Sequence, residues 1–476
     1  MDMKNAIPEQ AIQQGCSLSI LLSAYACEPD KGSEPGIGWK WARNLSMAGH
    51  QVFVITRENN RSSIEAALTK NPMPGVSFAY YDLPKWARWW KKGGRGVHLY
   101  YFLWQWGAYL LARKLCRRQR FDIVHHITFG VFRQPSFMAF LGLPFVFGPV
   151  GGGESAPYAL RRGFPMRGKV IDFLRDVANR LVNIDPLMSA VYSRSGVVLC
   201  KTRETLNSIP ERFREKCQLQ LEIGTGELGS TRSLKGPING IQHSDCGSSD
   251  SPSPLRGEGR GEGEMPEIGY AVTLSPTPLP SRERGFSRSP SLRILYVGRL
   301  VYLKGVHLAL PAFAHLYKQN PDARLTIVGS GPEEQRLKRL ASDLGIDHAI
   351  EWRSWLTQRE VMQVYPQHDV FLFPSLHDSS GNAVLEALSF GLPVVCLNLG
   401  GPGVLVDDSC GFRVSGPDEQ SVINELGRSM ITLAEDEPLR RKMSISAFAR
   451  ANEHFSWSKQ TERMCGIYTS LERIST

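Results

Sequence analysis

The sequence predicts an α/β protein with two Rossmann-like domains that face a cleft. The chain has 476 residues, enough for two domains with a core each. In both halves, short apolar runs alternate with glycine-containing loops and amphipathic stretches, as in a parallel sheet covered by helices. Between the halves, at residues 224–291, the composition shifts to Pro, Gly, Ser, Arg and Glu.

These observations divide the chain into five segments. The segment between the two domains is too poor in apolar residues to form a core, so we expect it to be a disordered insertion. Such an insertion is tolerable because the entropic cost of closing a loop grows slowly with its length. The expected segments are a disordered head at 1–17, a first domain at 18–223, the low-complexity linker at 224–291, a second domain at 292–450 and a C-terminal helix at 451–476.

Charge and cysteine usage narrow the class of protein. The formal net charge is +10, and residues 1–224 hold 30 Lys and Arg against 17 Asp and Glu. A basic first half fits an anionic lipid surface, a nucleic acid or a pyrophosphate-linked acceptor, although an ordinary basic protein explains it equally well. The nine cysteines show no Cys-x-x-Cys spacing, which argues against structural zinc and for a reducing compartment.

No stretch of the sequence has the pattern of a signal peptide or a membrane span. Residues 1–17 lack an apolar signal core. The longest apolar runs, 99–112 and 137–150, are too short or too broken by Pro and Gly to cross a bilayer. We therefore expect a cytoplasmic protein, at most peripheral on a membrane.

The first domain opens with a strand at 18–25, a glycine-containing loop at 27–38, a helix through Trp39 and Trp41, and a strand at 51–56. Loop amides at a helix N-terminus can meet phosphate or sugar oxygens. The loop contains Gly36-Ile37-Gly38 but no Gly-x-Gly-x-x-Gly, so the dinucleotide fingerprint is absent.

Residues 84–95 combine three tryptophans, Trp86, Trp89 and Trp90, with five basic residues. Indoles at headgroup depth with cations on phosphates would suit a membrane contact, and a loop packed on its own domain explains the segment equally well. Stacking on nucleic acid would use the same residues, but no nucleic-acid fold signature accompanies them. The run at 99–112 predicts a helix packed on the sheet, followed by a basic stretch to Arg120.

Three further strands are expected in the first domain, at 121–128, 144–150 and 196–202. The first of them carries His125 and His126. A histidine at a strand end is more often structural than catalytic. Because neighbouring strand residues face opposite ways, the sequence leaves open which of the two faces a site.

The second domain begins with a buried strand at 292–297 that delivers Arg299 and Lys304 to its carboxyl end. A diphosphate would be bound by two such fixed cations, whereas in isolation they are an ordinary solvated pair. A strand at 323–328, a helix at 333–344 and a short strand at 350–352 follow.

The most informative stretch is a βαβ unit at 369–403, with strands at 369–373 and 393–397, a helix at 383–388 and a flexible turn at 400–403. It carries Asp378 in the loop and Glu386 in the helix. A carboxylate can accept two hydroxyl hydrogen bonds, which suits a ribose diol or a sugar ring. On spacing alone, an ordinary surface helix explains Glu386 at least as well.

This unit resembles the retaining glycosyltransferases of family 4, also called glycosyl transferases group 1, which have the GT-B fold. The family signature Glu-x7-Glu, followed by Ala-x-x-x-Gly-x-Pro-Val, is matched by Glu386-Ala387, Gly391 and Pro393-Val394. The first acid departs from it, because position 378 is Asp, and Ser380-Gly381 stands in place of Phe-Gly. The shorter acid leaves the identity of the donor sugar open. The similarity covers the chain except the head and the insertion.

The resemblance implies roles for particular residues. Glu386 would hold the donor ribose and Asp378 would face the transferred sugar, while Arg299 and Lys304 would bind the pyrophosphate and stabilise it as it leaves. At least one of the two histidines would face the sugar, and the last helix would cross back onto the first domain. We assign further donor-binding roles to Gly36, Gly38, Gly381, Asn382 and Ala383.

The predicted enzyme is a retaining hexosyltransferase in bacterial cell-surface polysaccharide synthesis. Its partners would be a UDP- or GDP-sugar, a sugar or polyprenyl-linked acceptor and an anionic membrane on the inner face, with no nucleic acid. We expect no cofactor and no obligatory metal, because no Asp-x-Asp stands at a strand end. The alternatives are a non-catalytic or inactivated sugar-nucleotide-binding GT-B protein, and another two-Rossmann enzyme such as an epimerase or a phosphorylase.

Overall fold

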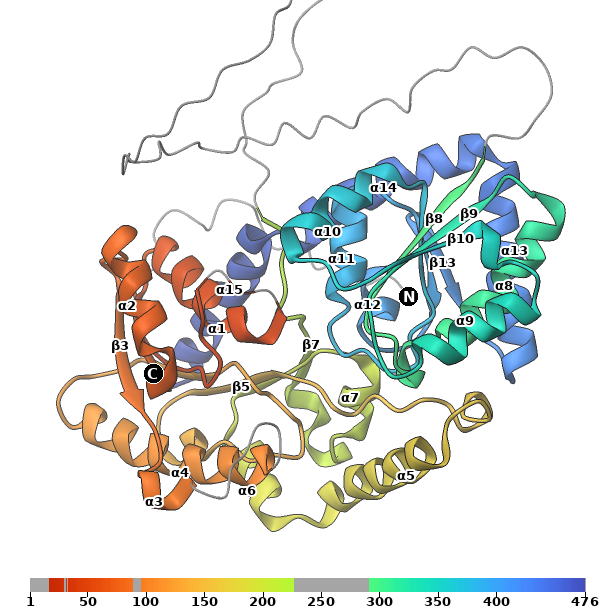
Figure 1. The fold of residues 1–476 in the computed structure, drawn as a ribbon. Helices are drawn as coiled ribbons and strands as arrows, with labels where there is room; N and C mark the ends of the chain where they lie inside the picture. Colours follow the sequence, from red (N-terminus) through yellow and green to blue (C-terminus); the bar gives the residue numbers. More distant parts are fainter. Residues whose placement is uncertain (1–16, 30, 32, 89–95, 227–290, 476) are drawn as a thin grey trace, which may run out of the picture. The chain divides into compact units, whose positions relative to one another are not determined.

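The computed structural model describes residues 17–29, 31, 33–88, 96–226 and 291–475. The expected disordered head and most of the low-complexity linker lie outside these residues. Within them, two separate parallel sheets are present, each flanked by helices (Figure 1). No helix in the described part of the chain is long and apolar enough to cross a membrane.

The first sheet has seven strands in the order β3-β2-β1-β4-β5-β6-β7, all parallel. The first three strands are added toward one edge of the sheet and the later strands toward the other edge. The strand order therefore reverses between β1 and β4, which is the position where ligands bind in open α/β sheets. The strands are β1 (Ser19–Ser23), β2 (Gln51–Arg57), β3 (Val76–Tyr81), β4 (Ile123–His126), β5 (Phe145–Val150), β6 (Val197–Cys200) and β7 (Cys217–Leu219). The helices are α1 (Ser33–Met47), α2 (Arg61–Lys70), α3 (Lys85–Arg88), α4 (Val97–Cys116), α5 (Met166–Leu181), α6 (Pro186–Arg194) and α7 (Arg203–Ser208).

The second sheet repeats this topology with six parallel strands, in the order β10-β9-β8-β11-β12-β13. Its reversal lies between β8 and β11. The strands are β8 (Arg293–Val297), β9 (Arg324–Val328), β10 (Ile350–Arg353), β11 (Val370–Phe373), β12 (Val394–Leu397) and β13 (Gly411–Val414). The helices are α8 (Val306–Gln319), α9 (Glu334–Asp343), α10 (Gln358–Val364), α11 (Asn382–Ser389), α12 (Gly400–Leu405), α13 (Glu419–Glu435), α14 (Glu437–Phe455) and α15 (Trp457–Ser475).

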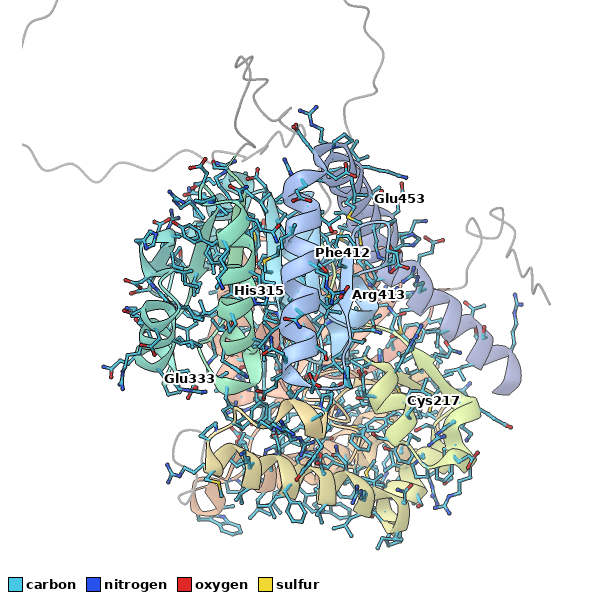
Figure 2. The ribbon with its side chains drawn as sticks, turned by 90° about the vertical axis from the view of Figure 1, so that its right-hand side faces the viewer. Cys217, His315, Glu333, Phe412, Arg413 and Glu453 are labelled. Atoms are coloured by element: carbon cyan, nitrogen blue, oxygen red, sulfur yellow. The ribbon has the colours of Figure 1, made fainter. Side chains whose placement is uncertain are left out.

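Alternating side chains on each strand form a core on both faces of the first sheet. On β1, Ile20 and Leu22 join one cluster and Leu21 joins the other, because successive residues of a strand point to opposite faces. Tyr468 of α15 belongs to the first cluster, so the last helix covers a face of the first sheet. On the second sheet, α8 and α13 lie side by side, with His315 against Gly427 (Figure 2).

Two local expectations were wrong. The expected glycine loop at 27–38 ends early, because α1 begins at Ser33 and contains Gly36 and Gly38. A Cβ on either glycine would overlap a backbone carbonyl, that of Lys31 for Gly36 and that of Ala26 for Gly38. Both glycines therefore serve the close packing of a helix on the preceding loop. The expected flexible turn at 400–403 is the start of α12.

The last segment also differs from the expected single helix. It consists of the end of α14 and of α15, with a break at Ser456. Ser456 forms a parallel bridge with Thr225, in which the Thr225 N–H donates to the carbonyl of Phe455 at 2.8 Å. Thr225 had been assigned to the linker. Strands β3, β7 and β13 had not been expected at all.

Candidate functional site

The carboxyl edge of the second sheet holds most of the predicted site residues. Arg299 and Lys304 follow β8, Asp378 follows β11, and Glu386 lies in the next helix, α11. Because β8 and β11 are neighbouring strands on either side of the reversal, their following loops meet at one place. The fold thus brings three of these residues to the edge where a ligand is expected.

Lys304 and Asp378 form a direct ion pair, with Nζ 2.5 Å from Oδ2. The other carboxylate oxygen accepts the backbone N–H groups of Ser380 at 3.2 Å and Gly381 at 2.7 Å. Burial would raise the pKa of Asp378, but the Lys304 charge and these hydrogen bonds hold it below its usual value. Asp378 is therefore ionised, and it fixes both Lys304 and the loop before α11.

The Arg299 side chain differs from that of Lys304 in having no ion-pair partner among the described residues. It is exposed to solvent. Lys304 has three N–H donors, so its bond to Asp378 leaves two for another acceptor. The loop after β8 thus carries an exposed guanidinium and an ammonium with donors to spare.

Gly381, Asn382 and Ala383 form the N-terminal end of α11. Gly381 has φ +74°, and a Cβ there would come within 2.8 Å of the Leu405 side chain, so glycine is required on both grounds. The first amides of a helix have no partner within the helix and carry partial positive charge. The end of α11 can therefore bind an anionic group beside Lys304.

Glu386 is held by side chains from two elements. Its Oε2 accepts the Tyr365 hydroxyl at 2.9 Å, and its Oε1 accepts the Gln358 amide at 3.5 Å. Burial raises the pKa of Glu386, against the opposing effect of these donors and of the positive charge of Lys40. Lys40 belongs to α1, so a cation from the first half of the chain acts on this carboxylate.

Two serines join the Asp378 loop to buried acids of the first half. The Ser379 hydroxyl donates to Glu154 at 2.8 Å, and the Ser380 hydroxyl donates to Glu222 at 2.6 Å. Glu154 also accepts from Gly152, Thr202 and Thr205. Burial would raise the pKa of Glu154, but these donors hold it below its usual value.

Glu222 is paired with a buried lysine that the sequence analysis did not single out. The Lys201 ammonium lies 2.6 Å from Glu222 and 3.9 Å from Glu34. Burial would lower the pKa of Lys201, but the two carboxylates raise it above its usual value. The sequence offered one signal for this residue, since Lys201 directly follows a buried apolar strand.

The two histidines do not join the group around Asp378. Both are buried, and their rings point to opposite faces of β4. The Nε2–H of His125 donates to the Gly148 carbonyl at 2.7 Å, and its Nδ1 accepts the Tyr468 hydroxyl at 2.6 Å. His126 contacts Tyr101 at 3.1 Å and Gln105 at 3.4 Å. Every ring nitrogen thus has a protein partner, and neither ring is exposed.

Burial also sets the charge of these rings. It lowers the pKa of His125 to about 4 and that of His126 to about 3. Both are therefore neutral near pH 7. Among the described residues, no group of three or more His, Cys, Asp or Glu side chains could hold a metal ion.

Comparisons of sequence fit this geometry. Residues 281–450 match the profile of the family described as glycosyl transferases group 1. A D-inositol 3-phosphate glycosyltransferase from Corynebacterium urealyticum is 33% identical over 184 residues, which are 37% of this chain and 42% of the relative. The chain thus spans about two fifths of the length of this relative.

Solved structures match over nearly the whole chain. A sucrose-phosphate synthase from Thermosynechococcus elongatus aligns with a TM-score of 0.59 at 15% identity, covering 96% of this chain and 99% of the other. Anabaena HepE, solved in complex with UDP and glucose, aligns with a TM-score of 0.52 at 13% identity, covering 95% and 100%. These likenesses show the GT-B fold, and within it residues 281–450 match the family described as glycosyl transferases group 1.

Proposed function

We propose that the protein transfers a sugar from a UDP- or GDP-sugar to an acceptor hydroxyl, with retention of the anomeric configuration. The observation that carries this proposal is the cationic edge after β8 and β11, where Arg299 and Lys304 follow β8 and Asp378 links Lys304 to the start of α11. A nucleotide diphosphate is the ligand that needs two fixed cations and helix amides at one place. HepE, a structural neighbour, was solved with UDP and glucose, which supports a nucleotide-sugar donor here.

The residues at this edge have distinct tasks in the proposed reaction. Arg299 and Lys304 neutralise charge that develops on the diphosphate as the bond to the sugar breaks. The first amides of α11 assist them. Glu386 accepts hydrogen bonds from the ribose hydroxyls, for which it must be ionised. Since no side chain in the described part of the chain is placed as a nucleophile at this edge, the departing phosphate takes the acceptor proton.

Asp378 positions Lys304 in this proposal. Its carboxylate has three partners within the protein, namely Lys304 and the amides of Ser380 and Gly381. A sugar hydroxyl can still donate to the remaining lone pairs, because an ionised carboxylate accepts about four hydrogen bonds. The shorter Asp side chain therefore combines loop-fixing with contact to the transferred sugar.

The acceptor and the location complete the proposal. The basic first half fits a polyprenyl-linked or other sugar acceptor at the inner face of a membrane, in cell-surface polysaccharide synthesis. We place the protein in the cytoplasm and peripheral on that membrane. The sequence has no Asp-x-Asp at a strand end, so we expect transfer to persist in a metal chelator.

A second candidate is a GT-B protein that binds a nucleotide-sugar without transferring it. The observation that favours it is the Lys304–Asp378 pair, since a lysine held by a carboxylate is a weaker partner for a leaving phosphate. Transfer or hydrolysis of the donor distinguishes the two candidates, because only an enzyme consumes the nucleotide-sugar.

Calorimetric binding of UDP, GDP and ADP tests the donor site. We expect one nucleotide to bind the wild type and to lose affinity about tenfold or more in Glu386→Ala, which removes the charged acceptor. Glu425→Ala, in an exposed part of α13, is the matched control and should bind as the wild type does. Equal affinity in Glu386→Ala and the control would move the site elsewhere.

A further inference from the structure

Helix α5 buries an acidic side chain against the protein and exposes most of its large apolar side chains to solvent. Asp172 is 1% exposed and pairs with Arg175 at 2.7 Å, whereas the next residue, Phe173, is 64% exposed. A Cβ on Gly168 would touch the Tyr302 ring at 2.9 Å, so this face of the helix is in contact. The exposed apolar residues of the helix are Met166, Val170, Ile171, Phe173, Leu174 and Leu181. This pattern reverses that of an ordinary surface helix.

Helix α4 carries a second exposed apolar stripe. It packs one side on the core through Tyr100, Trp104 and Ala108. On its other side, Leu99, Phe102, Leu103, Trp106 and Leu110 recur at helical spacing and are exposed. The sequence predicts that this run packs on the core, and only one side of it is buried.

The two stripes belong to one region of the first domain. The rings of Phe102 and Trp106 contact Phe137, in a short 3-10 helix at Phe137–Phe140, with centroids 5.4 and 5.2 Å apart. That 3-10 helix packs on α6, which follows α5 in the chain. Figure 1 shows α4, α6 and α5 along one edge of this part of the molecule. Groups of exposed large apolar side chains on neighbouring elements mark interaction surfaces.

The exposed charges on α4, on the turn that follows it and on α5 are all basic. The stretch 97–120 contains Arg113, Lys114, Arg117, Arg118 and Arg120 and no acid. Arg167, Lys169 and Arg180 are exposed on α5. Both acids of the stretch 161–184 form ion pairs with arginines. Asp172 pairs with Arg175, and Asp176 pairs with Arg161. An apolar surface bordered by cations is complementary to a bilayer with anionic headgroups.

We propose that the outer faces of α4 and α5 bind the surface of an anionic lipid bilayer, with the apolar side chains among the acyl chains and the Arg and Lys side chains on the phosphates. The helices lie in the interface plane. A protein that is peripheral on a membrane needs a surface that binds the membrane. The proposal therefore rests on the membrane location given under the proposed function, and not on sugar transfer.

Vesicle co-sedimentation of the full chain tests the surface. The probes are vesicles of phosphatidylcholine with about 30% phosphatidylglycerol, compared with pure phosphatidylcholine. We expect the wild type to prefer the anionic vesicles and Phe173→Ser/Leu174→Ser to weaken binding about tenfold or more, because two inserted side chains are lost. The matched control is Met47→Ser/Ile445→Ser, which replaces two equally exposed apolar residues on α1 and α14.

A charge variant supplies a second measurement. Arg167→Glu/Lys169→Glu should weaken binding to anionic vesicles several-fold and reduce its dependence on salt, since the phosphate contacts are removed. All these side chains are exposed, so the melting temperatures should match that of the wild type. If Phe173→Ser/Leu174→Ser has a lower melting temperature than the wild type, Val170→Ser/Ile171→Ser replaces it and tests the same helix.

Several results would overturn the proposal. Equal binding of Phe173→Ser/Leu174→Ser and the control would remove α5 from the contact while leaving the membrane location intact. Loss confined to Trp86→Ala/Trp89→Ala/Trp90→Ala would transfer the contact to residues 84–95. A wild-type dimer that the α5 variant dissociates would assign the face to a second copy. If the wild type bound no vesicles, both the α4 and α5 membrane surface and the membrane location would be wrong. Nucleotide calorimetry would still test the donor site independently.

Discussion

The two sheets share one strand order, but their carboxyl edges use polar residues in opposite ways. At the edge of the first sheet, His125, His126 and Lys201 are buried and bonded to partners within the protein. At the edge of the second, Arg299 is exposed and Lys304 retains free donors. The strand order therefore indicates where a ligand can bind. Whether the polar side chains there are exposed or already bonded indicates which edge can bind a charged ligand.

The largest effect on stability is expected at Lys201. Lys201→Met leaves Glu222 buried without its cation, and breaking a buried pair in this way costs about 3–5 kcal/mol. Urea denaturation should show a lower midpoint. The double variant Lys201→Met/Glu222→Gln removes both charges and should recover part of the loss. A single variant as stable as the wild type would show that the first edge does not depend on its internal ion pair.

Arg299 should give the converse result. Arg299→Ala removes an exposed cation that the proposed function assigns to the leaving diphosphate, and we expect transfer to fall about 10²–10³-fold while the urea midpoint stays unchanged. Arg428→Ala, in an exposed part of α13, is the control. Transfer rates are measured with the nucleotide-sugar that supports turnover. Full activity in Arg299→Ala would show that the exposed cation at the edge of the second sheet does not serve the reaction.

The buried histidines predict a stability that falls in acid. The unfolded rings take up protons below about pH 6.5, whereas folded His125 and His126 remain neutral down to about pH 4 and about pH 3. Unfolding is therefore favoured as the pH falls below about 6.5, by up to about 1.4 kcal/mol per pH unit for each ring. His126→Gln should show a shallower fall in melting temperature between pH 6.5 and pH 5. His454→Gln, an exposed control on α14, should keep the wild-type slope.

The smallest expected effect is at the link between the edges. Ser379→Ala removes one of four donors to Glu154, so we expect a loss of only about 1 kcal/mol in the free energy of unfolding. Ser409→Ala, at an exposed loop, is the control. A loss as large as that for Lys201→Met would make Ser379 a principal contact between the two halves.

The fold class and the family were predictable because the buried strands are continuous apolar runs and the βαβ unit is compact in sequence. Both predictions are confirmed. The strands that were missed are short or partly exposed, such as β7 with three residues. The first turn of α1 was predicted as a loop because Pro35 and Gly36 are residues typical of loops. Proline is compatible with the first turn of a helix, and tertiary packing overrides the low helix propensity of glycine.

The site was predictable only in part, and the roles of its residues stay predictions. Arg299, Lys304 and Asp378 follow apolar strands directly, so their position at a sheet edge could be read from the sequence. The partner of His125 is Tyr468, 343 residues away, and no local pattern indicates such a contact. The same holds for the pairing of Glu222 with Lys201, since both lie among ordinary residues.

The position of α15 has a consequence for biosynthesis. Domains generally fold from the N-terminus as they leave the ribosome. Here one face of the first sheet is covered partly by Met464, Tyr468 and Leu471, which are made after the entire second sheet. Until they emerge, the face of β1 and the Trp41 ring, which packs against Trp457, lack their cover. The half that is synthesised first is therefore completed last, and its nascent form exposes apolar surface that the finished protein buries.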